Sequence, residues 1–336
     1  MKIRPLSTML ACTFALSAMI ASSQVMAQKT LKLASFVPPI YILHKPIFLK
    51  LADDLKAATN GSVNIKVYAS GELGKGPVEQ YQRAVKRIAE ISYGLQGYTS
   101  PLFPRNLLIE LPGVASSPDD ATRKIWKVMD KYLRKEYRGT RPLAAFATAA
   151  AVIMSTKKAV HSPADIKGMK IRVPSKSSAA VVKAYGGTPV LMPATKVYTS
   201  MSTGVVDGAL MGADALLIFK LIEPTKFVTV GLPEMYTEIF LTMNQKAYDE
   251  LSGSEKAALD KLTGKILSLR ASGGLKGFGE KAISIFSKGK GKKVITLTPE
   301  NRKKFDVLAA KAVTDLVKEL EGKGIPAGEI LNAMKN

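Results

Sequence analysis

Apolar and polar residues alternate along several short stretches of the chain, which is the pattern of strands that bury one face. The strands predicted in this way lie at residues 31–36, 63–68, 91–95, 169–173, 188–192 and 206–211. Other stretches place apolar residues three and four positions apart, as amphipathic helices do. These predicted helices lie at residues 46–59, 76–88, 177–185 and 195–203. Strands that alternate with helices predict a parallel sheet with helices packed on its faces.

The strand–helix alternation occurs twice, on either side of an alanine-rich apolar run at residues 142–155. A chain of 336 residues also fits two domains of about 150 residues each. We therefore expect a two-domain α/β protein whose chain passes between the domains near this run. A capping box begins another predicted helix over 252–275, and a proline at the first helical position precedes the last one, over 300–320.

The N-terminus has the features of a cleavable signal peptide over residues 1–27. Lys2 and Arg4 precede an apolar stretch that is too short to span a bilayer, and small residues follow it up to Ala27. We therefore expect export to the periplasm. The single cysteine, Cys12, lies inside this segment, so the mature protein would contain none.

The composition excludes several classes of protein. Hydrophobic residues make up 46% of the chain, which is enough to bury a core and argues against a disordered basic tail. One cysteine excludes a disulfide scaffold and a cysteine-based metal site. The 49 Lys and Arg residues exceed the 27 Asp and Glu residues and give a net charge of +22, which favours anionic partners. Because the protein is expected to be exported, nucleic acid is not an expected partner.

Motifs of catalysis are absent from the sequence. It contains no H-E-x-x-H, no G-x-S-x-G and no G-x-G-x-x-G after a predicted strand. His44 and His161 lie far apart in the sequence, and a metal ion needs more ligands than these two. We therefore expect a binding protein without a cofactor rather than an enzyme.

One segment, residues 162–174 (SPADIKGMKIRVP), resembles the central motif of the solute-binding proteins of TRAP transporters, the DctP type. Further matches to this family follow the same order along the chain. They are Gly71–Gly74, Phe103-Pro104, Glu110–Pro112, Gly187–Val190, Val197-Tyr198, Gly204–Gly208 and Met243-Asn244.

The resemblance implies a periplasmic clamshell in which two domains, each a mainly parallel sheet flanked by helices, close over a ligand, with a long helix spanning both domains. The expected domains are residues 28–150 with about 240–278, and residues 151–239 with about 279–336. It also implies partners: a small carboxylate ligand, and a TRAP permease with small and large membrane subunits that is driven by an ion gradient. We expect a monomer. A receptor for an ABC importer or a sensor kinase stays an alternative, as does a surface adhesin or nucleic-acid scavenger that uses the positive charge.

The resemblance assigns Arg172 to the ligand carboxylate, and a planar guanidinium suits this role because it can donate two parallel hydrogen bonds. Several positions depart from the polar residues that sugar-acid and dicarboxylate receptors of the family carry. These positions are Phe36, Leu95, Tyr98, Val152 and Met211. Leu210 stands where a metal-assisted site has a glutamate, so we expect no metal.

These replacements predict one anchoring cation in an apolar and aromatic pocket. Burying the hydroxyl groups of a sugar acid there without partners would cost about 1–3 kcal/mol each. Phe36 and Tyr98, with Tyr41, Tyr93 and Tyr236 as further candidates, could stack on a ring. The hypothesis is a hydrophobic monocarboxylate, either an aromatic acid or a 2-oxo or 2-hydroxy aromatic acid. A small hydroxy or oxo acid, or a dicarboxylate, is the alternative.

Overall fold

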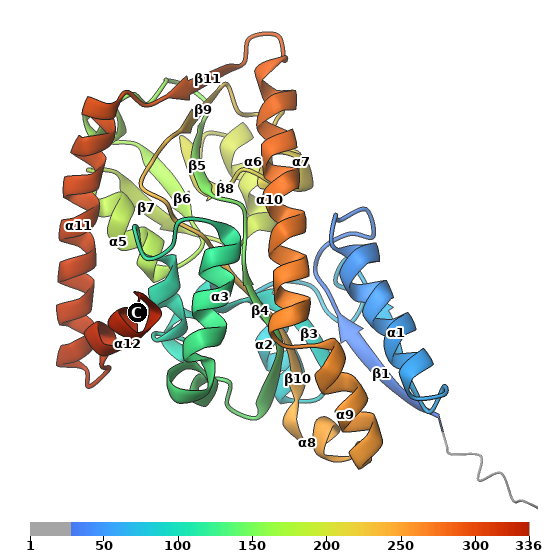
Figure 1. The fold of residues 1–336 in the computed structure, drawn as a ribbon. Helices are drawn as coiled ribbons and strands as arrows, with labels where there is room; N and C mark the ends of the chain where they lie inside the picture. The colour runs from blue at the N-terminus through green and yellow to red at the C-terminus, as the bar shows by residue number, and fades with distance from the viewer. Residues whose placement is uncertain (1–27, 336) are drawn as a thin grey trace, which may run out of the picture.

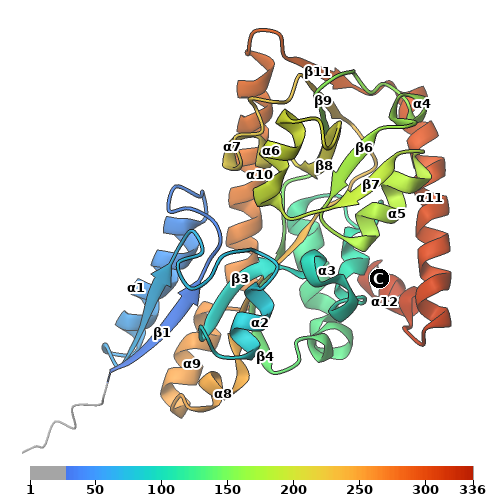
Figure 2. The same cartoon turned by 180° about the vertical axis from the view of Figure 1, so that it is seen from behind.

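Two β-sheets covered by helices form the protein, and Figure 1 and Figure 2 show them one above the other in a computed structural model that describes residues 28–335. The predicted signal peptide lies outside the described residues. The first sheet has the order β2-β1-β3-β10-β4, and the second has the order β11-β9-β5-β8-β6-β7. We call the first sheet with its helices lobe 1 and the second sheet with its helices lobe 2.

Lobe 1 takes its strands from the N-terminal half of the chain and from one later segment. They are β1 (Lys29–Ala34), β2 (Val63–Tyr68), β3 (Ile91–Leu95), β4 (Thr140–Ala147) and β10 (Glu238–Asn244). Lobe 2 takes its strands from the middle of the chain and from one segment near the end. They are β5 (Ala151–Ser155), β6 (Lys170–Val173), β7 (Thr188–Leu191), β8 (Gly208–Gly212), β9 (Phe227–Val230) and β11 (Lys293–Thr296).

The helices pack on the faces of these sheets and connect them. The α-helices are α1 (Lys50–Ala58), α2 (Gln80–Val85), α3 (Pro118–Val128), α4 (Pro163–Ile166), α5 (Lys176–Ala184), α6 (Val197–Ser202), α7 (Ala215–Ile218), α8 (Gln245–Asp249), α9 (Gly253–Leu262), α10 (Lys265–Ser287), α11 (Pro299–Gly322) and α12 (Ala327–Lys335). Short 3₁₀- and π-helical segments complete the set. They are η1 (His44–Leu49), η2 (Gln96–Leu102), η3 (Asn106–Glu110), η4 (Met129–Leu133), η5 (Arg134–Glu136) and η6 (Ala194–Lys196).

The predicted two-domain α/β architecture is confirmed, and the predicted strands recur within two residues. The sheets are mixed, because β10 runs antiparallel to β3 and β4, and β5 runs antiparallel to β8 and β9. Both strands enter their sheet directly from the other lobe. No helical crossover precedes them, so the βαβ rule that sets parallel neighbours does not apply to them.

Two predicted helices differ from the observed ones because residues with positive φ interrupt them. The helix expected over 76–88 is only α2, since Gly76 (φ +91°) and Arg87 (φ +54°) lie in the left-handed region. The helix expected over 252–275 is divided into α9 and α10 at Gly264 (φ +73°), whose amide donates to the carbonyl of Leu143 at 2.6 Å.

The long helix that spans both lobes is α10. It packs against α3 and β4 in lobe 1 and against α7 and β11 in lobe 2 (Figure 1). α11 likewise descends from lobe 2 toward lobe 1, where α12 packs on α3. The domain boundaries expected from the sequence stay a prediction, and the packing of α12 favours assigning it to lobe 1.

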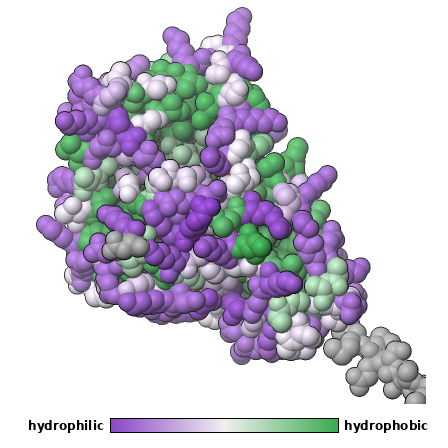
Figure 3. All heavy atoms as spheres, in the orientation of Figure 1, coloured by the Kyte–Doolittle hydropathy of each residue, from purple (hydrophilic) through white to green (hydrophobic). Residues whose placement is uncertain are grey.

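Hydrophilic residues cover most of the face seen in Figure 3, and apolar residues gather between α10 and α11. Within residues 28–335, no helix combines the length and apolar character needed to cross a bilayer.

Ser268 on α10 ties this helix to lobe 1 through buried hydrogen bonds. Its hydroxyl accepts from the amide of Ala145 on β4 (3.0 Å) and from the indole of Trp126 on α3 (2.8 Å). It donates to the carbonyl of Gly264 one turn earlier (2.8 Å). The hydroxyl therefore serves as an acceptor for two elements of lobe 1 in a place that water does not reach.

Replacing Ser268 with alanine should destabilise the protein. The variant leaves the amide of Ala145 buried without an acceptor, so we expect the free energy of unfolding to fall by about 1–3 kcal/mol. Ser284→Ala on the exposed face of the same helix is the matched control and should leave it nearly unchanged. Urea unfolding followed by circular dichroism measures both, and equal midpoints would contradict the prediction.

Candidate functional site

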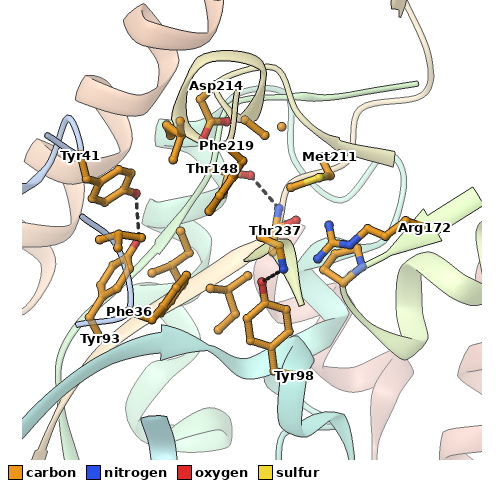
Figure 4. A pocket seen from close by; sticks show the side chains of 18 residues that line it. Phe36, Tyr41, Tyr93, Tyr98, Thr148, Arg172, Met211, Asp214, Phe219 and Thr237 are labelled. Carbon is orange, nitrogen blue, oxygen red and sulfur yellow. Dashed lines mark hydrogen bonds between the residues drawn. The ribbon is translucent and has the colours of Figure 1, made fainter. Parts of the chain in front are cut away.

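A cavity of about 480 Å³, including its opening, lies between the two lobes, and Figure 4 shows the side chains that line it. Lobe 1 and the loops around it supply mainly aromatic and aliphatic side chains, and lobe 2 supplies the charged groups. The lining residues are Phe36, Val37, Tyr41, Tyr93, Leu95, Tyr98, Thr148, Arg172, Pro174, Ala194, Met211, Gly212, Asp214, Ala215, Ile218, Phe219, Thr237 and Ile239.

Seven of the nine residues predicted for the site line this cavity, namely Arg172, Phe36, Tyr41, Tyr93, Leu95, Tyr98 and Met211. Val152 and Tyr236 do not. Val152 belongs to a buried core that includes Ala282 and Phe286 of α10. Tyr236 directly precedes Thr237, and successive side chains of an extended segment point to opposite faces, so Tyr236 packs into the core of lobe 1.

Arg172 lies in the middle of β6, paired with Val190 of β7 and Ala209 of β8, and its side chain is 1% exposed. The guanidinium Nε donates to the carbonyl of Met192 at 2.9 Å, which fixes the plane of the group. Its Nη2 is buried and has no hydrogen-bond partner. Burial lowers the pKa of the guanidinium, and the neighbouring Tyr98 and Glu110 partly offset this effect. A buried cation with a free donor is a site for an anion.

Tyr98 stands beside Arg172 and presents a second donor. Its hydroxyl oxygen accepts from the amide of Ala194 at 2.9 Å, so its proton stays available (Figure 4). Burial raises the pKa of Tyr98, and the charge of Arg172 lowers it. The two side chains can therefore donate to the same carboxylate from opposite lobes.

The opposite wall of the cavity is aromatic. Phe36 stacks on Tyr93 with ring centroids 5.7 Å apart and meets Tyr98 edge-on at 6.4 Å. Tyr93 also packs against Phe48 at 5.1 Å, and its hydroxyl lies 2.7 Å from that of Tyr41. Fixed rings in this arrangement can stack on a flat apolar group of a ligand.

The lobes are in direct contact next to Arg172, where η2 and η3 of lobe 1 meet the start of α5 in lobe 2. The hydroxyl of Ser175 donates to the carboxyl of Glu110, and that of Ser177 donates to the carbonyl of Leu107 at 3.0 Å. Gly97 approaches so closely that a Cβ there would lie 2.8 Å from Ser175 Cβ and 2.9 Å from the carbonyl of Pro174. The position thus requires glycine for close approach of the lobes.

Buried carboxyl groups surround this contact and have unusually high pKa values. Burial raises the pKa of Glu110 to about 7, although Ser175, the amide of Glu238 and the charge of Arg172 each lower it. Glu238 is completely buried with both oxygens unpartnered, so burial raises its pKa well above the usual range, and Glu110 adds to this effect. Burial also raises the pKa of Asp214, in the cavity wall, to about 7. These acids favour their neutral forms.

Several lining residues were not predicted from the sequence. Gly212 and Asp214 follow the last strand residue considered, Met211, and the rule that ligands bind beyond the carboxyl ends of strands would have pointed to them. Thr148 and Thr237 lie on the two segments that cross between the lobes. No local motif marks them, because the crossing segments come together only in the folded chain.

The groups in the cavity are suited to binding an anion, and in the part of the chain that the structure describes none of them is arranged for catalysis. Over residues 28–335, no three His, Cys, Asp or Glu side chains form a group that could hold a metal ion. The expectation that the protein needs no metal or cofactor stays a prediction. What the cavity offers is one cation, a neighbouring hydroxyl donor and an aromatic wall.

Comparison with known proteins agrees with this arrangement. The model of the family described as "Bacterial extracellular solute-binding protein, family 7" (DctP) matches residues 33–320. The chain belongs to this family. The predicted family is therefore confirmed, and so is the expectation of a solute-binding protein rather than an enzyme, because the family consists of solute-binding proteins.

Two relatives of the DctP family match part of the chain. A solute-binding protein of Chromohalobacter salexigens is 29% identical over 181 residues, which are 51% of this chain and 52% of the relative. A solute-binding protein of Albidiferax ferrireducens is 25% identical over 214 residues, 62% of each chain. The chain thus spans between half and two thirds of the length of these relatives.

Solved structures of TRAP solute-binding proteins share the fold over nearly the whole chain. One from a marine metagenome, described as specific for aromatic acid ligands and bound to 3-hydroxybenzoate, has a TM-score of 0.87 and 25% identity, covering 92% of this chain and 97% of that one. A second, from Rhodoferax ferrireducens with copurified benzoate, has a TM-score of 0.86 and 22% identity and covers 91% of this chain and 96% of that one. A third, from Roseobacter denitrificans with bound β-D-glucuronate, has a TM-score of 0.78 and 19% identity and covers 90% of this chain and 99% of that one.

The close approach at Gly97 gives a prediction for this DctP-family protein. Gly97→Ala should weaken ligand binding, because the added methyl group prevents the lobes from meeting as they do here. Gly277→Ala is the matched control, since a Cβ there meets nothing within 4 Å. Isothermal titration calorimetry with a ligand that binds the unchanged protein measures both, and the prediction is wrong if Gly97→Ala binds as tightly as the control.

The raised pKa of Glu110 predicts a pH dependence of stability. The folded protein holds a proton on Glu110 at pH values where the unfolded chain has lost it, so this group's contribution to stability is complete below about pH 4 and declines as the pH rises through about 7. The shift from 4.5 to about 7 corresponds to a decline on the order of 3 kcal/mol.

Glu110→Gln removes this titration. Between pH 5 and 8, the free energy of unfolding of the unchanged protein should fall relative to that of the variant, both measured by urea unfolding without ligand. Glu280→Gln, at an exposed position of α10, should follow the unchanged protein at every pH. Parallel pH profiles for Glu110→Gln and the unchanged protein would contradict the prediction.

Proposed function

We propose that this protein is an extracytoplasmic receptor of a TRAP-type, ion-coupled transport system that binds an aromatic or otherwise hydrophobic monocarboxylate. The observation that carries the proposal is the pairing of Arg172, buried with Nη2 free, with an aromatic wall in one cavity. The carboxylate would accept from Arg172 and Tyr98, and the ring would lie against Phe36 and its neighbours.

The lining of the cavity favours a ring over a sugar acid. Beyond Arg172, Tyr98 and Asp214, the polar side chains that line it are few. They are the Tyr41–Tyr93 pair, whose hydroxyls bond each other, Thr148, which donates to the carbonyl of Ala149 and accepts from the amide of Thr237, and the Thr237 hydroxyl itself. A uronate carries more hydroxyls than these few groups can pair, and each hydroxyl buried without a partner costs about 1–3 kcal/mol. An apolar ring instead gains about 25 cal/mol per Å² that it buries.

The structural relatives with benzoate and 3-hydroxybenzoate support an aromatic ligand, and the one with glucuronate supports the alternative of a sugar acid. The permease subunits, the periplasmic location, the cleavable signal peptide and the monomeric state belong to this proposal. A small hydroxy or oxo acid, or a dicarboxylate, stays the second candidate, as does a receptor of an ABC importer or sensor kinase.

A thermal-shift screen with benzoate, phenylacetate, mandelate, glucuronate and succinate tests the ligand class. We expect the aromatic acids to raise the melting temperature and glucuronate and succinate to leave it unchanged. If glucuronate or succinate stabilises the protein and no aromatic acid does, the proposed ligand class is wrong.

Arg172→Lys should weaken every carboxylate that binds by about 100-fold or more, because an ammonium cannot donate two coplanar hydrogen bonds. The affinity is measured by calorimetry with the best ligand of the screen. Arg270→Lys, on the exposed side of α10, should bind like the unchanged protein. If the Arg172→Lys variant and this control bind with equal affinity, Arg172 does not bind the ligand carboxylate.

A further inference from the structure

Asp214 brings a second ionisable group of opposite sign into the cavity wall. It lies between β8 and α7, lines the cavity and is 6% exposed. Its Oδ1 is buried and has no hydrogen-bond partner, and only the backbone amides of Asp214 itself and Ala149 lie close enough to favour its charged form. A carboxyl group in such a place is costly unless a donor reaches it.

The surroundings of Asp214 hold the carboxyl in place and, among residues 28–335, give its Oδ1 no donor. A Cβ at residue 212 would lie 2.4 Å from Asp214 Oδ1, so Gly212 permits this position. The same point lies 3.2 Å from the hydroxyl oxygen of Thr148. Thr148 donates its proton to the carbonyl of Ala149 at 3.0 Å, so it has none for Asp214.

Tyr41 and Tyr93 complete this part of the cavity. Their hydroxyls lie 2.7 Å apart and use one of their two protons between them, which leaves the other proton available. Burial raises the pKa of both tyrosines, and the charge of Asp214 raises it further. Figure 4 shows Asp214 and Tyr41 on one side of the cavity and Arg172 on the other.

An acceptor and a donor therefore meet at the end of the cavity away from Arg172. A neutral hydroxyl group matches them, since it donates through its proton and accepts through its oxygen. An unsubstituted ring at this place would leave the Asp214 carboxyl buried without a donor. A carboxyl group in its neutral form still accepts through its carbonyl oxygen, so the match does not depend on ionisation.

We propose that Asp214 recognises a hydroxyl group on the part of the ligand farthest from its carboxylate, so that the protein selects ring-hydroxylated aromatic acids over unsubstituted ones. This inference rests on the proposed function, because the carboxylate must first be fixed at Arg172. Asp214 then determines which aromatic acid the cavity prefers.

Calorimetry with matched pairs of acids tests the inference. The pairs are benzoate with 3- and 4-hydroxybenzoate, and phenylacetate with 3- and 4-hydroxyphenylacetate. The unchanged protein should bind at least one hydroxylated member about tenfold or more tighter than its parent. In Asp214→Leu, which removes the acceptor, this ratio should fall to about one, whereas Asp53→Leu, at an exposed position of α1, should keep it.

Two outcomes overturn the inference and leave the proposed function intact: the unchanged protein binds benzoate and phenylacetate as tightly as every hydroxylated partner, or Asp214→Leu keeps the full preference. If Asp214→Leu does not fold, the unchanged protein is the test: the inference is wrong if its affinities for hydroxylated and parent acids are equal. If no aromatic carboxylate binds the unchanged protein, the proposed function fails, and the inference fails with it.

Discussion

The site depends on a guanidinium that is buried without a carboxylate partner among residues 28–335. The Nε of Arg172 donates to the carbonyl of Met192, Tyr98 lies beside the group, and its buried Nη2 has no hydrogen-bond partner among residues 28–335. The buried charge disfavours the folded protein, because water cannot reach the group and no carboxylate of residues 28–335 forms a salt bridge with it. The cavity therefore carries an electrostatic requirement for an anion, and its aromatic lining restricts what the rest of that anion can be.

The protein contains acids close to Arg172 and keeps them from pairing with it. Glu110 interacts with the guanidinium through its charge, but its oxygens accept from Ser175 and from the amide of Glu238. Burial favours the neutral form of Glu110, and still more that of Glu238. Had Glu110 formed a bidentate pair with Arg172, the ligand carboxylate would have had to compete with it. Burial of these acids, together with the donors that occupy the oxygens of Glu110, thus leaves the guanidinium without an ion pair among residues 28–335.

Much of this arrangement could be predicted from the sequence, and the failures have physical causes. Strand alternation and the collinear family motifs located both sheets and placed Arg172, whose role needs the family because one charge in an apolar strand is as well explained by a structural ion pair. Tyr236 lies outside the cavity because one step along an extended segment reverses the side-chain direction. Val152 also lies outside it, and an apolar strand residue carries no mark of which core it joins. The opposed positions of Asp214 and Arg172 depend on how two lobes meet, which no local pattern encodes.

The contact between the lobes and the proposed ligand site use the same short segments, which would couple lobe contact to ligand binding. Arg172 lies on β6, and Ser175, three residues later, precedes α5 and donates to Glu110 of lobe 1. The cation and the lobe contact therefore lie on one short stretch of chain. When the lobes meet, Arg172 loses access to water, and without an anion its free donor is left unsatisfied at about 1–3 kcal/mol. A carboxylate in the cavity removes that penalty. The contact between the lobes would thus be more favourable with a bound carboxylate than without one. By linkage, a partner protein that binds the state with the lobes in contact would bind more tightly when the carboxylate is present.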